Sequence, residues 1–232
     1  MYFFQGTLIY FPTKKIEHSS FEETFNIDNE KIKVIVLNKG NKKAILYFPG
    51  RSETVAKNIE NYKKSFPNTT IYLVNYRAYG GSTGTPTEKN LYKDAKYIYD
   101  KISKRHENID VVGRSLGTGI ATYIASNSKI RKLVLVTPYD SILNIAKDKY
   151  PFFPIEYILT DQYNSINRAK KIDSPTLIFL ASEDKTVEIK YSKNLIKEFK
   201  PRLLTVKTIS SSNHKNIIDK MEYFKNLKEF LK

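Results

Sequence analysis

The most informative part of the sequence is "NIDVVGRSLGTGIA", residues 108–121. An apolar run leads to Gly113, a serine stands at position 115, and Gly117 and Gly119 follow. Glycines after a predicted strand indicate a sharp turn or a close approach to the backbone, as in a phosphate-binding loop or a turn that presents a nucleophile. The spacing does not fit G-x-G-x-x-G, and no G-K-[ST] ends a P-loop. The pattern is G-x-S-x-G, which is typical of a nucleophile elbow that exposes Ser115 on a strained strand-to-helix turn.

Short apolar and β-branched runs alternate with helical patterns along the chain. Runs of this kind are typical of strands buried on both faces of a parallel sheet. They lie at 31–37, 44–48, 70–76, 109–113, 132–137, 176–181 and 203–209. Helical spacing of apolar residues predicts helices at 86–104, 188–199 and 216–231. We therefore expect one α/β domain over residues 1–232, with a mostly parallel sheet, helices on both faces and an antiparallel hairpin at 21–38.

Two helices carry recognisable start signals. The helix at 86–104 is expected to have Thr85 as its N-cap, Pro86 at its first position and Glu88 completing a capping box. The helix after the elbow is expected to open at Ser115, within "SLGTGIATYIASN". The sequence therefore places the exposed serine at the start of a helix.

The elbow predicts two partners later in the chain, because its usual order is serine, then acid, then histidine. Asp184 follows the apolar run at 176–181, and His214 follows the run at 203–209 and precedes the last helix. His214 would take the Ser115 proton and pass it to the leaving group. Asp184 would hold the imidazole in the required tautomer and stabilise its cation.

Each assignment has a competing interpretation. Glu183, one residue before the predicted acid, is the rival carboxylate. His106 precedes a strand at the wrong end of the sheet and His18 lies in an N-terminal loop, which disfavours both as the base. The structural alternatives are a plain helix N-cap for Ser115 and a surface-loop residue for His214. The matching chain order argues against both.

An oxyanion hole is expected from two backbone N–H groups. One belongs to Leu116, the residue after the nucleophile, and the other comes from the loop "FPGRSETVAKN" after the run at 44–48. Gly50 permits the turn there, and Arg51 is preferred over Ser52 as the donor. The Arg51 side chain has two further interpretations, contact with an anionic substrate group or a plain loop charge.

The composition excludes several classes of function. The chain has 232 residues, a net charge of +15 and no cysteine, so disulfides and thiolate metal sites are excluded. His18, His106 and His214 lie far apart, and we expect neither a metal nor another cofactor. The positive charge would suit nucleic acid, but it comes mainly from dispersed lysines rather than arginines. We expect a solvated surface and no nucleic-acid partner.

Membrane and export signals are weak in this sequence. No apolar run reaches the roughly 18 residues of a membrane span, and "MYFFQGTLIYFP" is too short for a secretion signal. Aromatic residues and lysines at 2–15 suit weak contact with an anionic lipid surface, and the alternative is an edge strand. We expect a cytoplasmic location.

The segment 138–162, between the runs at 132–137 and 176–181, is predicted to form a short cap over the site. Its aromatic residues Tyr139, Phe152 and Phe153 are expected to line an acyl pocket. Ordinary packing of a small helix onto the body is the alternative.

The ordered motifs resemble the small α/β-hydrolase-domain serine hydrolases, a group that includes protein depalmitoylases and many bacterial esterases. The motifs are "FPGRSETVAKN", "NYRAYGGSTGTPTE", "GRSLGTG", "TPYDSILNIAK", "YPFFP", "ASEDKTV" and "NH". The resemblance implies the α/β-hydrolase fold and the same triad of Ser115, Asp184 and His214. Two departures are Pro49, where the group usually has histidine, and Ala78, where it commonly has glycine. Relatives often have a hydrophobic N-terminal anchor, so a longer native N-terminus and membrane association form the alternative location.

These observations predict a serine hydrolase that cleaves carboxylic esters or thioesters through an acyl-enzyme. The expected partner is a small-molecule or acylated substrate, and the sequence assigns no oligomeric state. Two alternatives stay open. A peptidase or amidase would use the same triad, and a catalytically silent binding module could share the fold.

Overall fold

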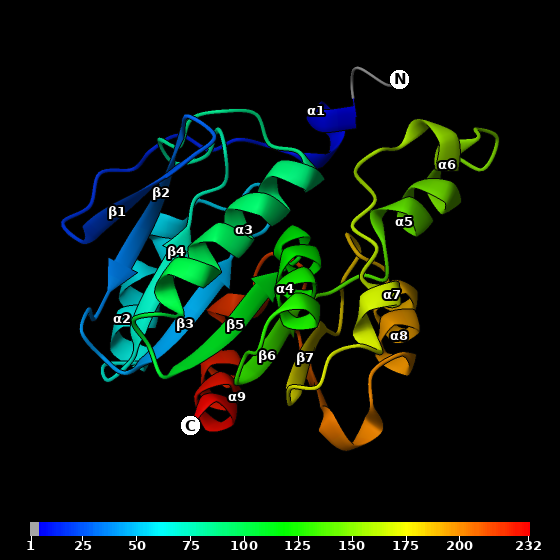
Figure 1. Ribbon diagram of the computed structural model, residues 1–232. Coiled ribbons are helices and arrows are strands. Elements are labelled where there is room, and N and C mark those ends of the chain that lie inside the picture. Colours follow the sequence, from blue (N-terminus) through cyan, green and yellow to red (C-terminus); the bar gives the residue numbers. More distant parts are fainter. Residues whose placement is uncertain (1–4) are drawn as a thin grey trace.

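The computed structural model describes residues 5–232, in which eight strands form one sheet (Figure 1). The strands are β1 (Phe21–Ile27), β2 (Glu30–Leu37), β3 (Lys43–Phe48), β4 (Thr70–Val74), β5 (Asn108–Arg114), β6 (Lys132–Val136), β7 (Thr176–Ala181) and β8 (Leu204–Ile209). Their spatial order is β1-β2-β4-β3-β5-β6-β7-β8. β2 runs antiparallel to β1 and β4, and the other neighbours are parallel. The predicted mostly parallel sheet and leading hairpin are confirmed.

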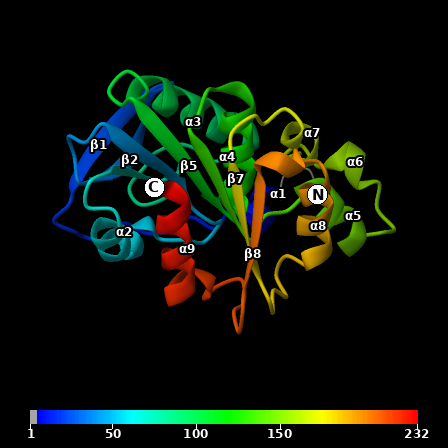
Figure 2. The same cartoon turned by 90° about the horizontal axis from the view of Figure 1, so that it is seen from below.

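Helices cover both faces of this sheet, as the sequence predicts (Figure 2). The described helices are α1 (Gln5–Ile9), α2 (Ile59–Ser65), α3 (Glu88–Ile102), α4 (Leu116–Asn127), α5 (Ile142–Lys149), α6 (Ile155–Ile158), α7 (Ile166–Ala169), α8 (Ile189–Lys197) and α9 (Met221–Leu231). Apolar residues of α3, α4, α7 and α8 share one core cluster with the sheet, while α2 and α9 belong to the cluster on the opposite face.

The central strands are apolar because both of their faces are covered by helices. All residues of β4 and β7 are buried, and β3, β5 and β6 are buried except at their ends. β8 differs, since four of its six residues are exposed. The expectation of a run buried on both faces is therefore wrong at 203–209. The reason is that β8 forms one edge of the sheet and has a neighbouring strand on one side only.

The start of α3 differs from the predicted capping box. The helix begins at Glu88, and its N-cap is Thr87, whose hydroxyl accepts the Asn90 N–H at 3.1 Å. The expected cap at Thr85 is therefore wrong. The Glu88 carboxylate is used elsewhere, since it accepts the backbone N–H groups of residues 162–163 at 2.6 and 3.0 Å. A tertiary contact with the end of the cap segment thus replaces the local reciprocal bond.

Residues 5–15 do not form the edge strand considered as the alternative to lipid contact. Residues 1–4 lie outside the described residues, and the following residues form α1 and then an irregular chain. Hydrogen bonds to side chains and loops, rather than pairing with a strand of the sheet, hold this segment. Tyr10 donates to Asp161 at 2.6 Å, and the Phe11 N–H lies 3.1 Å from the Arg51 carbonyl and 2.8 Å from the Tyr79 hydroxyl.

Candidate active site

Ser115 lies at the turn between β5 and α4, with φ 49° and ψ −117°. A non-glycine residue at this positive φ is strained, as expected for an elbow. The glycines on both sides allow α4 to begin directly against the sheet. A Cβ on Gly113 would lie 2.4 Å from the Gly117 carbonyl oxygen, and one on Gly117 would lie 2.1 Å from the Phe48 carbonyl oxygen. The predicted strand, turn and helix at this motif are all present.

His214 joins the serine to a carboxylate. Its Nε2 lies 2.8 Å from Ser115 Oγ, and its Nδ1 lies 2.8 Å from Asp184 Oδ2. Asp184 follows β7 and His214 follows β8, so the ends of three parallel strands supply the three side chains. Because a carboxylate only accepts, Nδ1–H donates to Asp184 and Nε2 is left to accept from the serine hydroxyl. The structure thus brings the three predicted residues into one hydrogen-bonded chain.

Asp184, rather than Glu183, faces the histidine. Its second oxygen accepts the backbone N–H groups of Thr186 at 2.9 Å and Val187 at 2.8 Å. The Asp184 side chain is 3% exposed, whereas Glu183 is exposed to solvent. Two backbone donors therefore fix the carboxylate in the orientation that the imidazole needs.

The loop after β3 lies directly beside the serine. A Cβ on Gly50 would come within 3.5 Å of Ser115 Cβ, and Arg51 lines the cavities on both sides of the serine. The Leu116 N–H is the first of α4, and the first N–H groups of a helix have no acceptor within it. Arg51 and Leu116 thus flank the serine, and their use as oxyanion donors stays a prediction. Pro49, which departs from the resembled motif, is held through its carbonyl by the Tyr76 hydroxyl at 2.7 Å.

The Arg51 side chain is engaged with the N-terminal segment. Its Nη1 donates to the Leu8 carbonyl oxygen at 3.1 Å, and its guanidinium carbon lies 4.7 Å from the centre of the Phe11 ring. These contacts give the Arg51 side chain a packing role in addition to the two interpretations from the sequence. Arg51 links the loop after β3 to the segment that forms one wall of the neighbouring cavity.

The sequence analysis did not predict a nearly buried ion pair that lies next to Ser115. Arg114 Nη1 lies 2.9 Å from Glu53 Oε2, and the same oxygen accepts the Gly50 N–H at 2.8 Å. Arg114 Nη2 donates to the carbonyl oxygens of His214 and Lys215 at 3.1 and 2.9 Å. The pair therefore ties together the loop after β3, the elbow and the histidine loop.

Two further donors complete this network. The other oxygen of Glu53 accepts from the Tyr47 hydroxyl and the Asn58 amide, both at 2.6 Å. Burial would lower the pKa of Arg114, but the adjacent Glu53 carboxylate raises it, and the net shift is upward. Arg114 therefore stays cationic. The signal available in the sequence was the charged residue inside G-x-S-x-G together with an acid in the loop after β3.

A cavity of about 420 Å³ opens on one side of Ser115. Its lining is mostly apolar and comes mainly from α1, the cap segment and the elbow, with Val187 from the loop after β7. Two cations, Arg51 and Lys149, also belong to the lining, which holds no carboxylate among residues 5–232. The lining includes Leu8, Ile9, Phe11, Leu116, Tyr139, Ile142, Ile145, Ala146, Tyr150, Leu159 and Val187. Such a cavity suits an apolar group of a substrate.

The three predicted pocket residues separate in the structure. Tyr139 is buried, lines the apolar cavity and lies with its hydroxyl 3.2 Å from the Leu116 carbonyl oxygen. Phe152 and Phe153 are 96% and 48% exposed and lie outside this lining. Their assignment to the pocket is wrong, because both side chains are exposed to solvent, whereas the cap segment faces the cavity mainly through α5, Tyr150 and Leu159.

A second cavity, of about 390 Å³, opens on the other side of Ser115. Its lining is polar and comes from the loop after β3, the 3-10 turn before α2 (Val55–Asn58) and the segment that carries His214 after β8. It includes Arg51, Ser52, Lys57, Asn58, Asn61, Arg114, His214 and Lys215. The serine therefore stands between an apolar and a polar cavity.

Residues 5–232 contain neither a candidate metal cluster nor a candidate membrane-spanning helix. No group of three or more histidine, aspartate or glutamate side chains in this range is placed to hold a metal ion. No helix in the same range has the length and apolar character to cross a membrane.

Comparison with known proteins agrees with this architecture. The family profile described as "alpha/beta hydrolase fold" matches residues 43–153. An esterase of Pyrococcus furiosus, Pf2001, is similar in structure, with a TM-score of 0.71 at 17% identity, covering 95% of both chains. The chain has the α/β-hydrolase fold. Its resemblance to the α/β-hydrolase-domain proteins is confirmed as well.

Curated relatives of this α/β-hydrolase-fold chain are longer proteins. Human alpha/beta hydrolase domain-containing protein 17C is 29% identical over 168 residues, covering 71% of this chain and 50% of the human protein. An uncharacterised protein of Mycobacterium tuberculosis is 30% identical over 131 residues, covering 55% of this chain and 47% of its own length. The chain thus spans about half the length of the curated relatives it matches.

Proposed function

We propose that this protein is a serine hydrolase that cleaves carboxylic esters or thioesters through a covalent acyl-enzyme. The observation that carries the proposal is the chain of two 2.8 Å hydrogen bonds from Ser115 through His214 to Asp184. A serine hydroxyl is a weak nucleophile until an adjacent base takes its proton. The fold and its similarity to a Pyrococcus esterase support the same class of reaction.

In the first half-reaction, Ser115 Oγ attacks the acyl carbonyl carbon while His214 Nε2 takes the hydroxyl proton. The carbonyl oxygen becomes an oxyanion next to the N–H groups of Leu116 and Arg51, which stabilise it. The tetrahedral intermediate then collapses. The bond to the leaving oxygen or sulfur breaks, His214 returns the proton to that atom, and the acyl group remains on Ser115.

In the second half-reaction, water takes the place of the leaving group. His214 removes a proton from the water as the oxygen attacks the acyl carbon. Collapse of the second intermediate releases a carboxylic acid and returns the proton to Ser115. Asp184 orients the imidazole and stabilises its cation, since two backbone N–H groups and Nδ1–H hold its carboxylate in place.

Turnover of p-nitrophenyl esters from acetate to palmitate tests the proposal. We expect the wild type to hydrolyse these esters with an optimum at one chain length, because the apolar cavity is bounded. Ser115→Ala should lower kcat by at least about 10³-fold, since removal of the nucleophile leaves only the oxyanion hole and binding. Ser103→Ala, at the exposed C-terminal end of α3, is the matched control and should keep wild-type turnover.

Labelling by a fluorophosphonate separates the alternatives. Labelled Ser115 with no ester turnover would support a serine enzyme and overturn oxygen esters as its substrates, in favour of a thioester or an amide. A protein that neither turns over esters nor labels at Ser115 would be a binding module, and the proposal would be wrong.

A further inference from the structure

The two cavities beside Ser115 are not equivalent, because the histidine faces only one of them. Ser115 lines both, whereas Leu116 lines the apolar cavity and His214 lines the polar one. In acyl transfer, the group that donates a proton to the leaving atom must lie within hydrogen-bond reach of that atom. The leaving group of the proposed reaction therefore belongs in the polar cavity, and the acyl chain belongs in the apolar cavity.

The polar cavity is positively charged. Lys57 is exposed at the 3-10 turn before α2, and Lys215 is exposed next to the catalytic histidine. Across residues 5–232, neither Lys57 Nζ nor Lys215 Nζ has an ion-pair partner within 4.0 Å. Two amines that no carboxylate neutralises thus face the space where the leaving group would lie.

The acidic residues of this cavity do not cancel the charge. Glu53 is neutralised by Arg114 at 2.9 Å. Asp219 is the remaining carboxylate of the lining, and the two lysines Lys57 and Lys215 outnumber it. The cavity therefore carries a net positive charge at neutral pH. A partly enclosed site with charge of one sign attracts groups of the opposite sign.

We propose that the leaving alcohol or thiol carries an anionic group, a carboxylate or a phosphate, which binds Lys57 and Lys215 while an apolar acyl chain fills the other cavity. This inference rests on the proposed hydrolase function and specifies its substrate. The anionic group takes no part in bond breaking. Ser115 Oγ forms the new bond to the acyl carbon, the bond to the leaving oxygen or sulfur breaks, and His214 protonates that atom.

Two matched esters test the charge preference directly. Butyrate esters of 4-nitrophenol and of 3-carboxy-4-nitrophenol share the acyl group and the nitrophenolate chromophore, and they differ by one carboxylate. We expect the wild type to favour the carboxylated ester in kcat/KM by about fivefold or more at low ionic strength, as attraction between nearby unit charges at a protein surface allows. Added salt should reduce this ratio, because the lysines are exposed.

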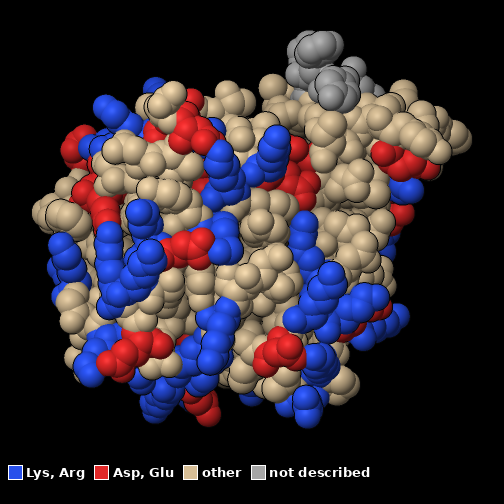
Figure 3. Space-filling view, in the orientation of Figure 1, with Lys and Arg blue, Asp and Glu red and all other residues tan. Residues whose placement is uncertain are grey.

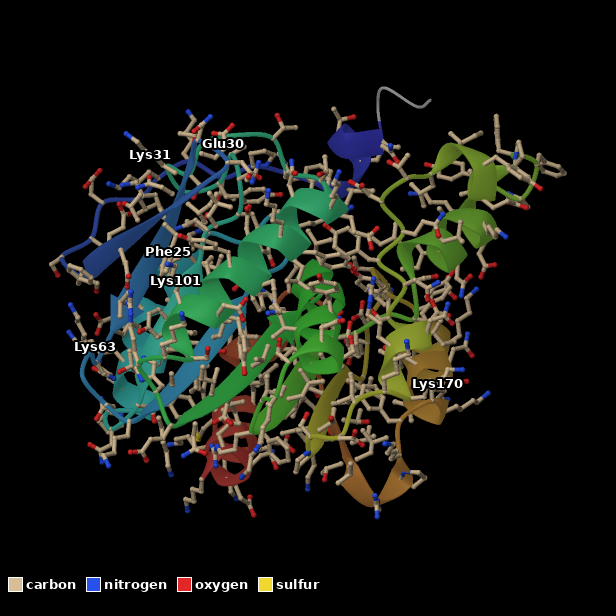
Figure 4. The ribbon with its side chains drawn as sticks, in the orientation of Figure 1. Phe25, Glu30, Lys31, Lys63, Lys101 and Lys170 are labelled. Atoms are coloured by element: carbon tan, nitrogen blue, oxygen red, sulfur yellow. The ribbon has the colours of Figure 1, made fainter. Side chains whose placement is uncertain are left out.

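Charge variants then assign the preference to the two lysines. Lys57→Gln and Lys215→Gln should each lower the ratio of carboxylated to neutral ester, and Lys57→Glu combined with Lys215→Glu should invert it. Lys170→Gln is the matched control. Lys170 follows α7, is exposed and lies outside the lining of both cavities, so the ratio should not change (Figure 4).

The outcomes separate this inference from the function on which it rests. Hydrolysis of both esters with equal kcat/KM, unchanged in the lysine variants, would overturn the anionic leaving group and leave the serine hydrolase standing. A ratio that fell equally in Lys170→Gln would overturn it too, because net protein charge would then be the cause. Absence of turnover together with absence of fluorophosphonate labelling at Ser115 would overturn both.

Discussion

At the scale of single residues, the candidate site depends on side chains that hold loops as much as on those that would react. Glu53 accepts from Gly50 in the loop after β3, and Arg114 donates to the carbonyls of His214 and Lys215. The ion pair between them, at 2.9 Å, is nearly buried, with side chains 8% and 11% exposed. A buried pair of this kind fixes the relative positions of loops that are distant in sequence.

Removing one charge of this pair should be costly. Glu53→Gln leaves the Arg114 guanidinium buried without a carboxylate, which typically lowers the free energy of unfolding by about 3 kcal/mol. Because the loops on both sides of Ser115 lose their tie, we also expect kcat to fall about tenfold with a smaller change in KM. Chemical denaturation and ester kinetics measure the two effects.

The exposed pair of Lys42 and Glu107 supplies a control of the same chemistry. Their side chains are 80% and 62% exposed, and exposed ion pairs contribute little to stability. Glu107→Gln should therefore leave both the denaturation midpoint and kcat unchanged. Equal changes in the denaturation midpoint and in kcat for Glu53→Gln and Glu107→Gln would contradict the role assigned to Glu53.

At the scale of elements, the cap segment forms one wall of the apolar cavity. Helix α5 lines it through Ile142, Ile145 and Ala146, and Leu159 follows α6. In the ribbon, α5 and α6 lie close to α1, away from the edge that β1 forms (Figure 1). The N-terminal helix and the cap together enclose the space in which an acyl chain would bind.

Narrowing this space should change the preference for acyl-chain length. Ile145→Trp fills part of the cavity, so we expect kcat/KM for the longest accepted p-nitrophenyl ester to fall at least about tenfold, as overpacking by 1–3 kcal/mol would give. Turnover of the acetate ester should change much less. The measurement is the ratio of kcat/KM for the longest accepted ester to kcat/KM for the acetate ester, compared between the variant and the wild type.

Phe152→Ala is the control for this experiment, because Phe152 belongs to the same segment but is 96% exposed and lies outside the cavity. Its chain-length profile should match that of the wild type. A shift in the profile with Phe152→Ala and none with Ile145→Trp would show that the acyl chain binds elsewhere on the cap.

At the scale of the whole molecule, charged residues are dispersed, whereas the candidate site is confined to one end of the sheet. Lysines and arginines are spread over the face shown in Figure 3, with aspartates and glutamates between them. The candidate site lies at the ends of β5, β7 and β8, where parallel strands bring their following loops together. His106 lies at the opposite end of the sheet, two residues before β5 begins.

His106 gives the fold a dependence on pH that is separate from catalysis. Its Nδ1 bonds the Asn41 carbonyl oxygen and its Nε2 bonds the Tyr72 hydroxyl, both at 2.8 Å. Burial lowers the pKa of His106 below its ordinary value of 6.5. The unfolded chain therefore takes up a proton at a higher pH than the folded chain does. The contribution of His106 to stability is full above about pH 6.5 and is lost as the pH falls toward the folded pKa.

Thermal unfolding of His106→Gln at two pH values tests this assignment. At pH 7.5 the variant should unfold about 2–4 °C below the wild type, because a net hydrogen-bond contribution of about 1 kcal/mol is lost. At pH 5.5 the gap should narrow, since the wild type has lost part of what His106 contributes. A gap that stayed constant or widened on acidification would contradict a lowered pKa in the folded state.

Local patterns in the sequence predicted the order of the main strands and helices and the three residues that the structure joins in one hydrogen-bonded chain. Buried strands must be continuously apolar, and the elbow must carry glycines where a Cβ would meet backbone, as at Gly117 beside the Phe48 carbonyl. These requirements are local, so they can be recognised from residues that are adjacent in the sequence. Asp184 and His214 were predictable for a related reason, because each lies in the loop that follows a parallel strand, and the strand direction fixes the end of the sheet at which that loop lies.

The tertiary structure alone decided which side chains meet across loops. Nothing local to Phe152 indicated that it would face solvent while Ile145 faced the cavity, because the orientation of α5 depends on how the cap packs. Glu53 likewise pairs with Arg114, and Glu88 accepts the backbone N–H groups of residues 162–163. Both contacts join residues that are distant in sequence. Such contacts follow from the packing of whole elements, which short-range pattern does not specify.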